Sequence, residues 1–142
     1  MTTADHVEQF RRAESLLADR RPLAALEALA PVLDAEPDAP SVLLLAGRAY
    51  FHSAQLGRAE LVFRRLVEAD PTDHYSRFVL GRTLQRQGRF GEALTQLRMA
   101  IVMDPRPDYQ DALGEVQARL ALGTDPPADP ADPADPAGPA GP

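Results

Sequence analysis

Arginine supplies most of the side chains in this chain that could bind a charged ligand. The chain has 142 residues, with 15 Lys+Arg against 21 Asp+Glu and a formal net charge of −6, and all of its strongly basic residues are arginine. Residues 74–107 contain six arginines and two acidic residues, so this segment is basic within an acidic protein. The planar guanidinium group donates paired hydrogen bonds to carboxylates. We therefore expect this segment to bind acidic groups.

The other reactive residue types do not form a catalytic or metal-binding pattern. The three histidines, His6, His52 and His74, lack the H-x-x-x-H and H-E-x-x-H spacings of helical metal sites. The chain has no cysteine, which excludes disulfides, thiolate metal sites and a thiol nucleophile. The absence of lysine excludes a Schiff-base enzyme. The sequence therefore predicts a protein that is not an enzyme and that holds no metal or cofactor.

Composition also restricts the partners. The net charge of −6 disfavours nucleic acid as a partner, because nonspecific binding to phosphate needs a surplus of cations. The apolar runs, such as Val42 to Ala46, are far shorter than the roughly 20 residues of a membrane helix. The N-terminus has neither the basic nor the apolar region of a secretory signal. We expect a cytoplasmic protein that does not bind membranes.

The elements that must position the arginines are repeated along the chain. Three acidic-Pro dipeptides, Glu36-Pro37, Asp70-Pro71 and Asp104-Pro105, follow one another at intervals of 34 residues. Other columns keep their size class in the same register: Ala13, Gly47 and Gly81; Ala25, Ala59 and Ala93; and Leu29, Phe63 and Leu97. A fixed period in the range of about 20–50 residues is typical of proteins built from stacked structural repeats.

Each repeat has the apolar spacing of two short helices. In the second repeat, apolar or small residues stand at i, i+3, i+4 and i+7 from Leu43 to Tyr50, and similar spacing resumes after Gln55. Gly88 suits the turn between the helices of the third repeat, because glycine adopts a positive φ without strain. Three aspartates are candidate N-caps for the first helix of the following unit: Asp38, Asp73 and Asp108.

This register resembles the tetratricopeptide repeat (TPR). The best-matching stretches are Leu80-Gly81-x-x-Leu84 and Gly88-Arg89-Phe90-x-x-Ala93-x-x-x-Leu97, and the repeat ends at Asp104-Pro105. The resemblance implies an all-α, right-handed α-solenoid of antiparallel helix pairs over residues 4–122. The repeats would span about 6–39, 40–73 and 74–107, followed by a capping helix at 108–122. The sequence departs from the family where a tryptophan is usual, at Gln9, Leu43 and Arg77.

The resemblance also implies where a partner binds. TPR arrays use the concave surface formed by the first helices to hold an extended peptide or a partner helix. In this chain we expect Arg48, Arg82 and Arg86, with His52, to hold carboxylates, and the aromatic residues to take apolar side chains. The expected groove consists of Phe10, Leu44, Arg48, Phe51, His52, Tyr75, Phe78, Arg82, Gln85, Arg86 and Tyr109. The implied function is a non-catalytic protein–protein interaction module or adaptor, whose protein or peptide partner carries acidic and apolar side chains.

Three alternatives remain open at this point. The groove arginines could be a solvated helix face and the aromatic residues inter-repeat packing, the chain could be a self-associating scaffold or homodimer, or it could be an RNA-binding helical repeat. The two-carboxylate clamp of TPR chaperone adaptors is not expected here, because its places hold Phe10, Glu14, Leu45, Tyr75 and Val79. Four arginines on second helices are interpreted as plain surface: Arg64, Arg65, Arg89 and Arg98.

The last 20 residues, 123–142, differ from the repeats. They contain no apolar side chain larger than alanine, and proline recurs at every third position from Pro127 to Pro142. Such a segment cannot bury enough apolar surface to offset the entropy of ordering, so we expect a disordered tail. In a polyproline II conformation, Asp129, Asp132 and Asp135 would lie along one edge, where they could bind the groove arginines in cis.

Overall fold

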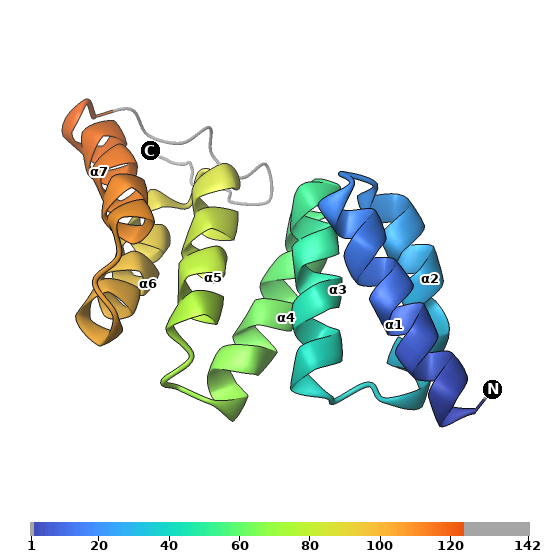
Figure 1. Cartoon of the computed structure of the whole chain (residues 1–142). Helices are drawn as coiled ribbons and strands as arrows, with labels where there is room; N and C mark the ends of the chain where they lie inside the picture. The colour runs from blue at the N-terminus through green and yellow to red at the C-terminus, as the bar shows by residue number, and fades with distance from the viewer. Residues whose placement is uncertain (1, 124–142) are drawn as a thin grey trace, which may run out of the picture.

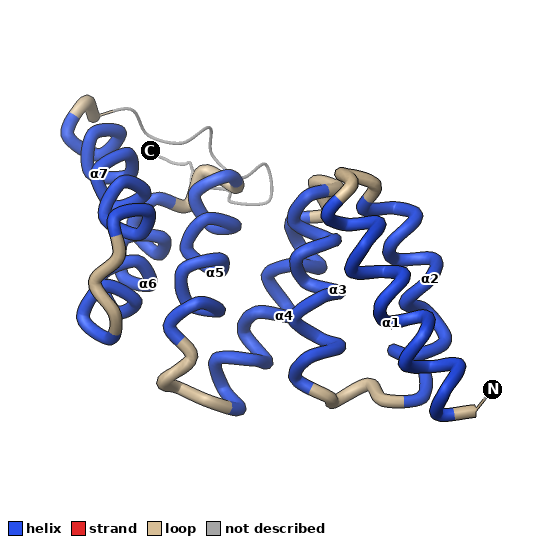
Figure 2. The backbone as a smooth tube through the Cα atoms, in the orientation of Figure 1, coloured by secondary structure: helices blue, strands red, loops and turns tan. Residues whose placement is uncertain are grey.

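In a computed structural model of the chain, residues 2–123 are described, and they form antiparallel helix pairs followed by a last helix (Figure 1). The helices are α1 (Thr3–Ala18), α2 (Pro22–Ala35), α3 (Pro40–His52), α4 (Leu56–Ala69), α5 (His74–Arg86), α6 (Phe90–Met103) and α7 (Pro107–Ala121). Within residues 2–123 the chain between these helices forms short turns and no strand (Figure 2). The expected all-helical solenoid is confirmed. The disordered tail expected over residues 123–142 lies, apart from Gly123, outside the described residues.

Proline and aspartate begin several of the helices. Asp73 caps α5 as expected, because its side chain accepts a hydrogen bond from a backbone N–H of the first turn, three residues later. The same expectation is wrong for Asp38 and Asp108. Pro40 and Pro107 are the first residues of α3 and α7, so the cap positions fall on the residues directly before these prolines. Proline suits this position because its missing N–H would have no partner inside the helix.

The turn inside each helix pair has one residue in the left-handed region. Arg20, Ala54 and Gly88 occupy equivalent places in the three pairs, with φ values of 62°, 62° and 77°. The third pair uses glycine, which adopts this conformation at no steric cost. The first two use residues for which it costs roughly 1 kcal/mol. The backbone of the turn therefore repeats even where the side chain does not.

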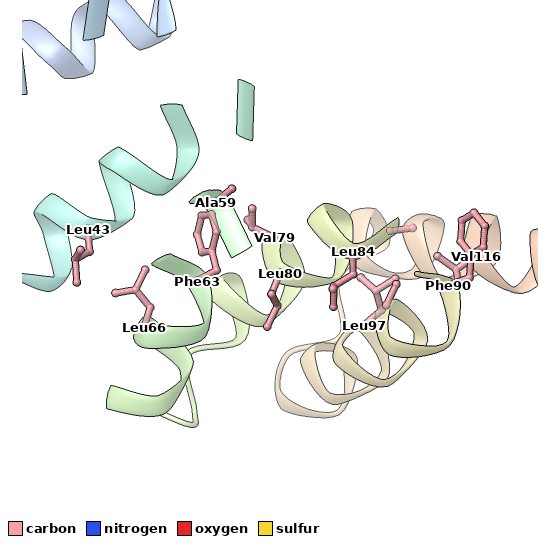
Figure 3. Packing of buried hydrophobic residues seen from close by; sticks show 12 residues of the cluster. Leu43, Ala59, Phe63, Leu66, Val79, Leu80, Leu84, Phe90, Leu97 and Val116 are labelled. Atoms are coloured by element: carbon pink, nitrogen blue, oxygen red, sulfur yellow. The ribbon is translucent and has the colours of Figure 1, made fainter. Parts of the chain in front are cut away.

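Close approach of neighbouring helices holds the pairs together. A Cβ atom added to Gly81 would lie 2.8 Å from Cγ of Leu97, and one added to Gly47 would lie 2.9 Å from the Phe63 ring. Phe63 and Leu97 are both fully buried. Figure 3 shows Phe63 and Leu97 within the hydrophobic core that extends from α3 to α7. The small column of the sequence thus marks the points where a first helix meets the large residue of its own second helix.

Arg77 occupies one of the places where the TPR family has tryptophan. Its side chain is buried, with 8% of the residue exposed. Its Nε donates to the carbonyl of Pro71 at 3.1 Å, and its Nη1 donates to Gln96 at 3.2 Å. The guanidinium therefore links the turn before α5 to the face of α6, where an aromatic ring would make apolar contacts.

The interpretation of Arg89 as plain surface is wrong. Its guanidinium binds Glu60 of α4 at 2.7 Å and Glu92 of α6 at 2.8 Å. Burial alone would raise the pKa of Glu60, but hydrogen bonds from Arg64 and Arg89 outweigh this effect, and the pKa of Glu60 is lowered. These contacts join the second helices of successive pairs.

The packing at Gly81 leads to a stability prediction. Replacing Gly81 with alanine forces Leu97 or α5 to move within a filled core, so we expect the free energy of unfolding to fall by about 1–3 kcal/mol. The matched control is Gly114→Ala in α7, where an added Cβ meets nothing within 4 Å. We expect this substitution to raise the free energy of unfolding by about 0.5–1 kcal/mol. Urea unfolding followed by circular dichroism measures both, and equal effects would contradict the close contact.

Candidate functional site

The first helices of the pairs and the last helix share one face of the molecule. Figure 1 shows α1, α3, α5 and α7 toward the viewer, with α2, α4 and α6 behind them. We call the surface formed by these four helices the odd-helix face. Every residue of the expected groove lies on one of these four helices.

Aromatic residues connect α5 to α7 on this face. The Phe78 ring stacks on Tyr109 with centroids 4.4 Å apart, and Tyr75 lies 6.4 Å from Phe78. Tyr75 is 37% exposed and Phe78 is half-buried. Tyr109 is only 1% exposed, and its hydroxyl lies 2.9 Å from Nδ1 of His74. The expectation that Tyr109 lines the binding surface therefore does not hold, because Tyr109 supports Phe78 from below.

Two of the expected groove residues, Arg82 and Gln85, already bind a carboxylate of the chain itself. Arg82 donates to Oε1 of Glu115 at 3.1 Å, and Gln85 donates to the same oxygen at 3.0 Å. The hydrogen bonds from Gln85 and then Arg82 lower the pKa of Glu115. The sequence interpretation missed Glu115, although it stands one further period of 34 residues after Gly81. Glu115 continues the column of small residues Ala13, Gly47 and Gly81, and a charged residue at such a position could have indicated this contact.

A second group of residues meets at the C-terminal end of α3. Arg86 of α5 donates from Nη1 to the carbonyl of Phe51 at 3.0 Å, and its guanidinium lies 4.8 Å from the centroid of the Phe51 ring. The rings of Phe51 and His52 meet edge to face, with centroids 5.4 Å apart. Arg48 lies on α3, one turn before His52. The structure thus brings together four of the residues expected to bind a ligand.

The environment of His52 is positively charged. Its pKa lies below the ordinary histidine value, first because of partial burial and then because of the charges of Arg48, Arg86 and Arg20. The sequence interpretation missed Arg20, which lies in the turn after α1 and carries no motif. We call Arg20, Arg48, His52 and Arg86 the basic cluster. Within residues 2–123, none of these four side chains forms an ion pair with a carboxylate.

Of the remaining expected residues, Phe10 lies on α1 and Leu44 lies on α3, one turn before Arg48. Phe10 lines a surface hollow of about 310 Å³ between α1 and α3, together with Val7, Glu14 and Val42. Phe10 packs against the core of the first pair and the start of α3. Leu44 is half-buried and packs against the core that extends toward α7. Phe10 thus belongs to the hollow at the first pair, whereas Leu44 lies on the face of α3 that carries Arg48 and His52.

Among residues 2–123, no group of three or more histidine, aspartate or glutamate side chains could hold a metal ion. No helix in the same range has both the length and the apolar character needed to span a membrane.

The basic cluster leads to a titration prediction. Removing a positive charge near His52 should raise its pKa toward the ordinary value of about 6.5. We expect this upward shift in Arg48→Gln and in Arg86→Gln, measured by NMR titration of the His52 ring. Arg98→Gln on α6 is the control, since Arg98 is not among the charges that act on His52. An unchanged His52 pKa in both test variants would contradict the proximity of the cluster.

Comparison with known proteins gives matches that agree with this arrangement. Residues 10–74 match a family model described as tetratricopeptide repeat. The first TPR of Spaghetti (RPAP3), solved bound to an HSP90 peptide, is 15% identical with a TM-score of 0.76, over 85% of this chain and 97% of that one. The Sgt2 TPR domain from Aspergillus fumigatus is 19% identical with a TM-score of 0.75, over 96% and 93% of the two chains.

A third similar structure belongs to a longer protein. An O-GlcNAc transferase from Thermobaculum terrenum is 28% identical with a TM-score of 0.68, and the match covers 84% of this chain but only 23% of the transferase. None of the curated proteins compared with the chain matches it. Residues 10–74 thus match the tetratricopeptide repeat, and the repeat period and the paired helices of residues 2–123 have the same arrangement.

Proposed function

We propose that the chain is a non-catalytic adaptor that binds an acidic peptide or partner helix on the odd-helix face, where α3 meets α5. The observation that carries the proposal is the basic cluster. Its arginines have no carboxylate partner within residues 2–123, and Arg86 is stacked on a half-buried Phe51. Arginine beside an aromatic ring is a combination that is enriched where proteins bind partners.

The neighbouring side chains define the chemistry of the ligand. Arg48 and Arg86 offer guanidinium N–H groups to carboxylates, and charged hydrogen bonds of this kind are stronger than neutral ones. Phe51 and the partly exposed Phe78 offer apolar surface nearby on the same face. Arg82 is not assigned to the ligand, because Glu115 already holds it. The ligand that fits is a segment with acidic side chains alternating with apolar ones.

The similar structures support the general role rather than the ligand. One of them is a TPR bound to an HSP90 peptide. In the present chain, two places of the two-carboxylate clamp hold Leu45 and Val79, which are only 4% and 6% exposed. These side chains belong to the hydrophobic core and cannot bind a carboxylate. We therefore propose a different mode of acidic recognition, centred on the basic cluster.

A display selection tests this function directly. A library of displayed random peptides is selected against the full-length protein, and the enriched peptides are synthesised and measured by calorimetry. We expect enriched peptides with both acidic and apolar residues, and we expect the double variant Arg48→Glu/Arg86→Glu to lower their affinity at least about tenfold, or about 1.4 kcal/mol.

The matched control reverses two arginines on even-numbered helices. Arg58→Glu/Arg98→Glu changes the net charge by the same amount but lies on α4 and α6. We expect this control to bind the peptides within about twofold of the unchanged protein. Circular dichroism checks that both variants fold. Equal affinity of the peptides for the two double variants would overturn the assignment of the site, and a selection without enrichment would overturn the function.

The lowered pKa of His52 predicts a pH dependence of peptide binding. An acidic ligand favours the protonated imidazole, so it raises a pKa that lies below about 6.5 in the free protein. Proton uptake on binding makes the affinity rise as the pH falls from 8 to 6, while the ligand carboxylates stay ionised. We expect His52→Gln to remove most of this rise, measured by calorimetry at several pH values. A pH profile that is the same in His52→Gln would contradict the role of His52.

A further inference from the structure

The basic cluster gathers charges from three separate parts of the chain. Arg20 lies in the turn after α1, Arg48 and His52 lie on α3, and Arg86 is the last residue of α5. A surface hollow of about 500 Å³ lies beside it, lined by Leu17, Ala18, Arg20, Pro22 and His52. The C-terminal end of a helix favours cations, which explains how this charge is tolerated at the ends of α3 and α5.

The described chain ends on the same edge of the molecule. Figure 1 shows α3, α5 and α7 running in the same direction, so that the C-terminal ends of these helices lie along one edge. These three helices end at His52, Arg86 and Ala121, and Gly123 follows α7 by two residues. Residues 124–142 therefore start from the edge that carries the basic cluster.

The sequence beyond Gly123 has the charge that the cluster lacks. Residues 124–142 contain four aspartates, at positions 125, 129, 132 and 135, and no basic residue. Their spacing places a carboxylate at every third position from Asp129 to Asp135. The proline residues between them lower the entropy that the segment loses when it is held in an extended form.

The length of the segment is sufficient. At about 3.1 Å per residue, the 12 residues from Gly123 to Asp135 can reach roughly 37 Å. The most distant member, Arg20, follows α1 and lies three repeats from α7, which at 8–10 Å per packed helix layer is roughly 24–30 Å. The nearer member, Arg86, lies on α5, which packs beside α7. The aspartates can thus reach the cluster without any movement of the helices.

We propose that residues 124–142 bind the basic cluster in cis, with Asp129, Asp132 and Asp135 facing Arg86, Arg48 and Arg20. The contact blocks the surface to which we assign the acidic partner, so that the partner must displace it. The intramolecular contact stands on the charges and reach given above, whereas its role as an autoinhibitor rests on the proposed function. Arg82 is not part of the contact, because Glu115 holds it.

A spin label tests the contact in the full-length chain. The chain has no cysteine, so Ala131→Cys provides a single labelling site between Asp129 and Asp132. We expect a nitroxide at this position to broaden the amide resonances around Arg48, His52 and Arg86 in NMR spectra. The broadening should disappear in about 1 M NaCl, where the Debye length is only about 3 Å. Unchanged broadening in high salt would contradict an electrostatic contact.

Two matched variants establish the charges involved. The quadruple variant Asp125→Asn/Asp129→Asn/Asp132→Asn/Asp135→Asn keeps the prolines and the length of the segment but removes its charge. Arg48→Gln/Arg86→Gln removes the charge of the other side. We expect each variant to abolish the broadening at the cluster and to leave the helices unchanged. Broadening that persists in the quadruple variant, or that is confined to α7 in the unchanged chain, would overturn the proposal.

Mixing experiments separate a contact in cis from one between molecules. Spin-labelled protein without isotope is added to ¹⁵N-labelled protein without a spin label. A contact in cis gives no broadening in this mixture at any concentration. Broadening that grows with concentration would instead show that the segment binds a second copy, and would overturn the proposal.

The regulatory role is tested with the peptides of the display selection. A tethered segment acts at an effective concentration of about 1 mM, so a segment of millimolar to submillimolar affinity weakens partner binding about 2- to 10-fold. We expect the quadruple aspartate variant to bind the selected peptides more tightly by this factor. Suppose that the selected peptides bind the unchanged protein and the quadruple variant equally, and that the spin label shows no contact. This result would overturn the inference and leave the proposed function intact. A spin-label contact without any selected peptide would support the contact and overturn the function.

Discussion

The close approach of helices within each pair is the constraint on which the other features depend. Gly47 and Gly81 have no room for a Cβ atom, because Phe63 and Leu97 fill the space beside them. The first helix of a pair therefore buries one side against its own second helix, which turns the opposite side outward. Since each pair repeats this arrangement, the outward sides form one face along α1, α3, α5 and α7. The candidate site exists because, within residues 2–123, no further layer of helices covers that face.

Electrostatics then divide that face into unlike parts. Toward α7, Arg82 and Gln85 converge on Glu115, and the charges are satisfied inside the protein. Toward α3, the basic cluster has no acidic partner within residues 2–123. Burial, and then the positive charges of Arg48, Arg86 and Arg20, lower the pKa of His52. Carboxylates bound at the basic cluster would reduce the repulsion between its positive charges. These carboxylates could belong to a partner or to residues 124–142.

Several features could be predicted from the sequence because they depend on local spacing. The 34-residue period predicted the helix pairs, and the column of small residues in the sequence coincides with the points where the two helices of a pair approach closely. Asp73 could be predicted as a cap, whereas Asp38 and Asp108 could not be distinguished from it, since a nearby proline shifts the start of a helix by one or two residues. The missed contacts of Arg89 and Arg82 join different helices, so their partners depend on how the pairs stack.

By itself the sequence determined the fold and the residue types available for binding. Periodicity and helix-ending residues are local properties, and a repeated local property suffices to specify a stack of helix pairs. Only the tertiary structure decided which of those residues are available. It buried Tyr109 beneath Phe78, gave Arg82 to Glu115, and brought Arg20 to His52 from a turn without any motif. The reason is physical: burial and charge pairing depend on distances between side chains far apart in the sequence, and packing sets these distances.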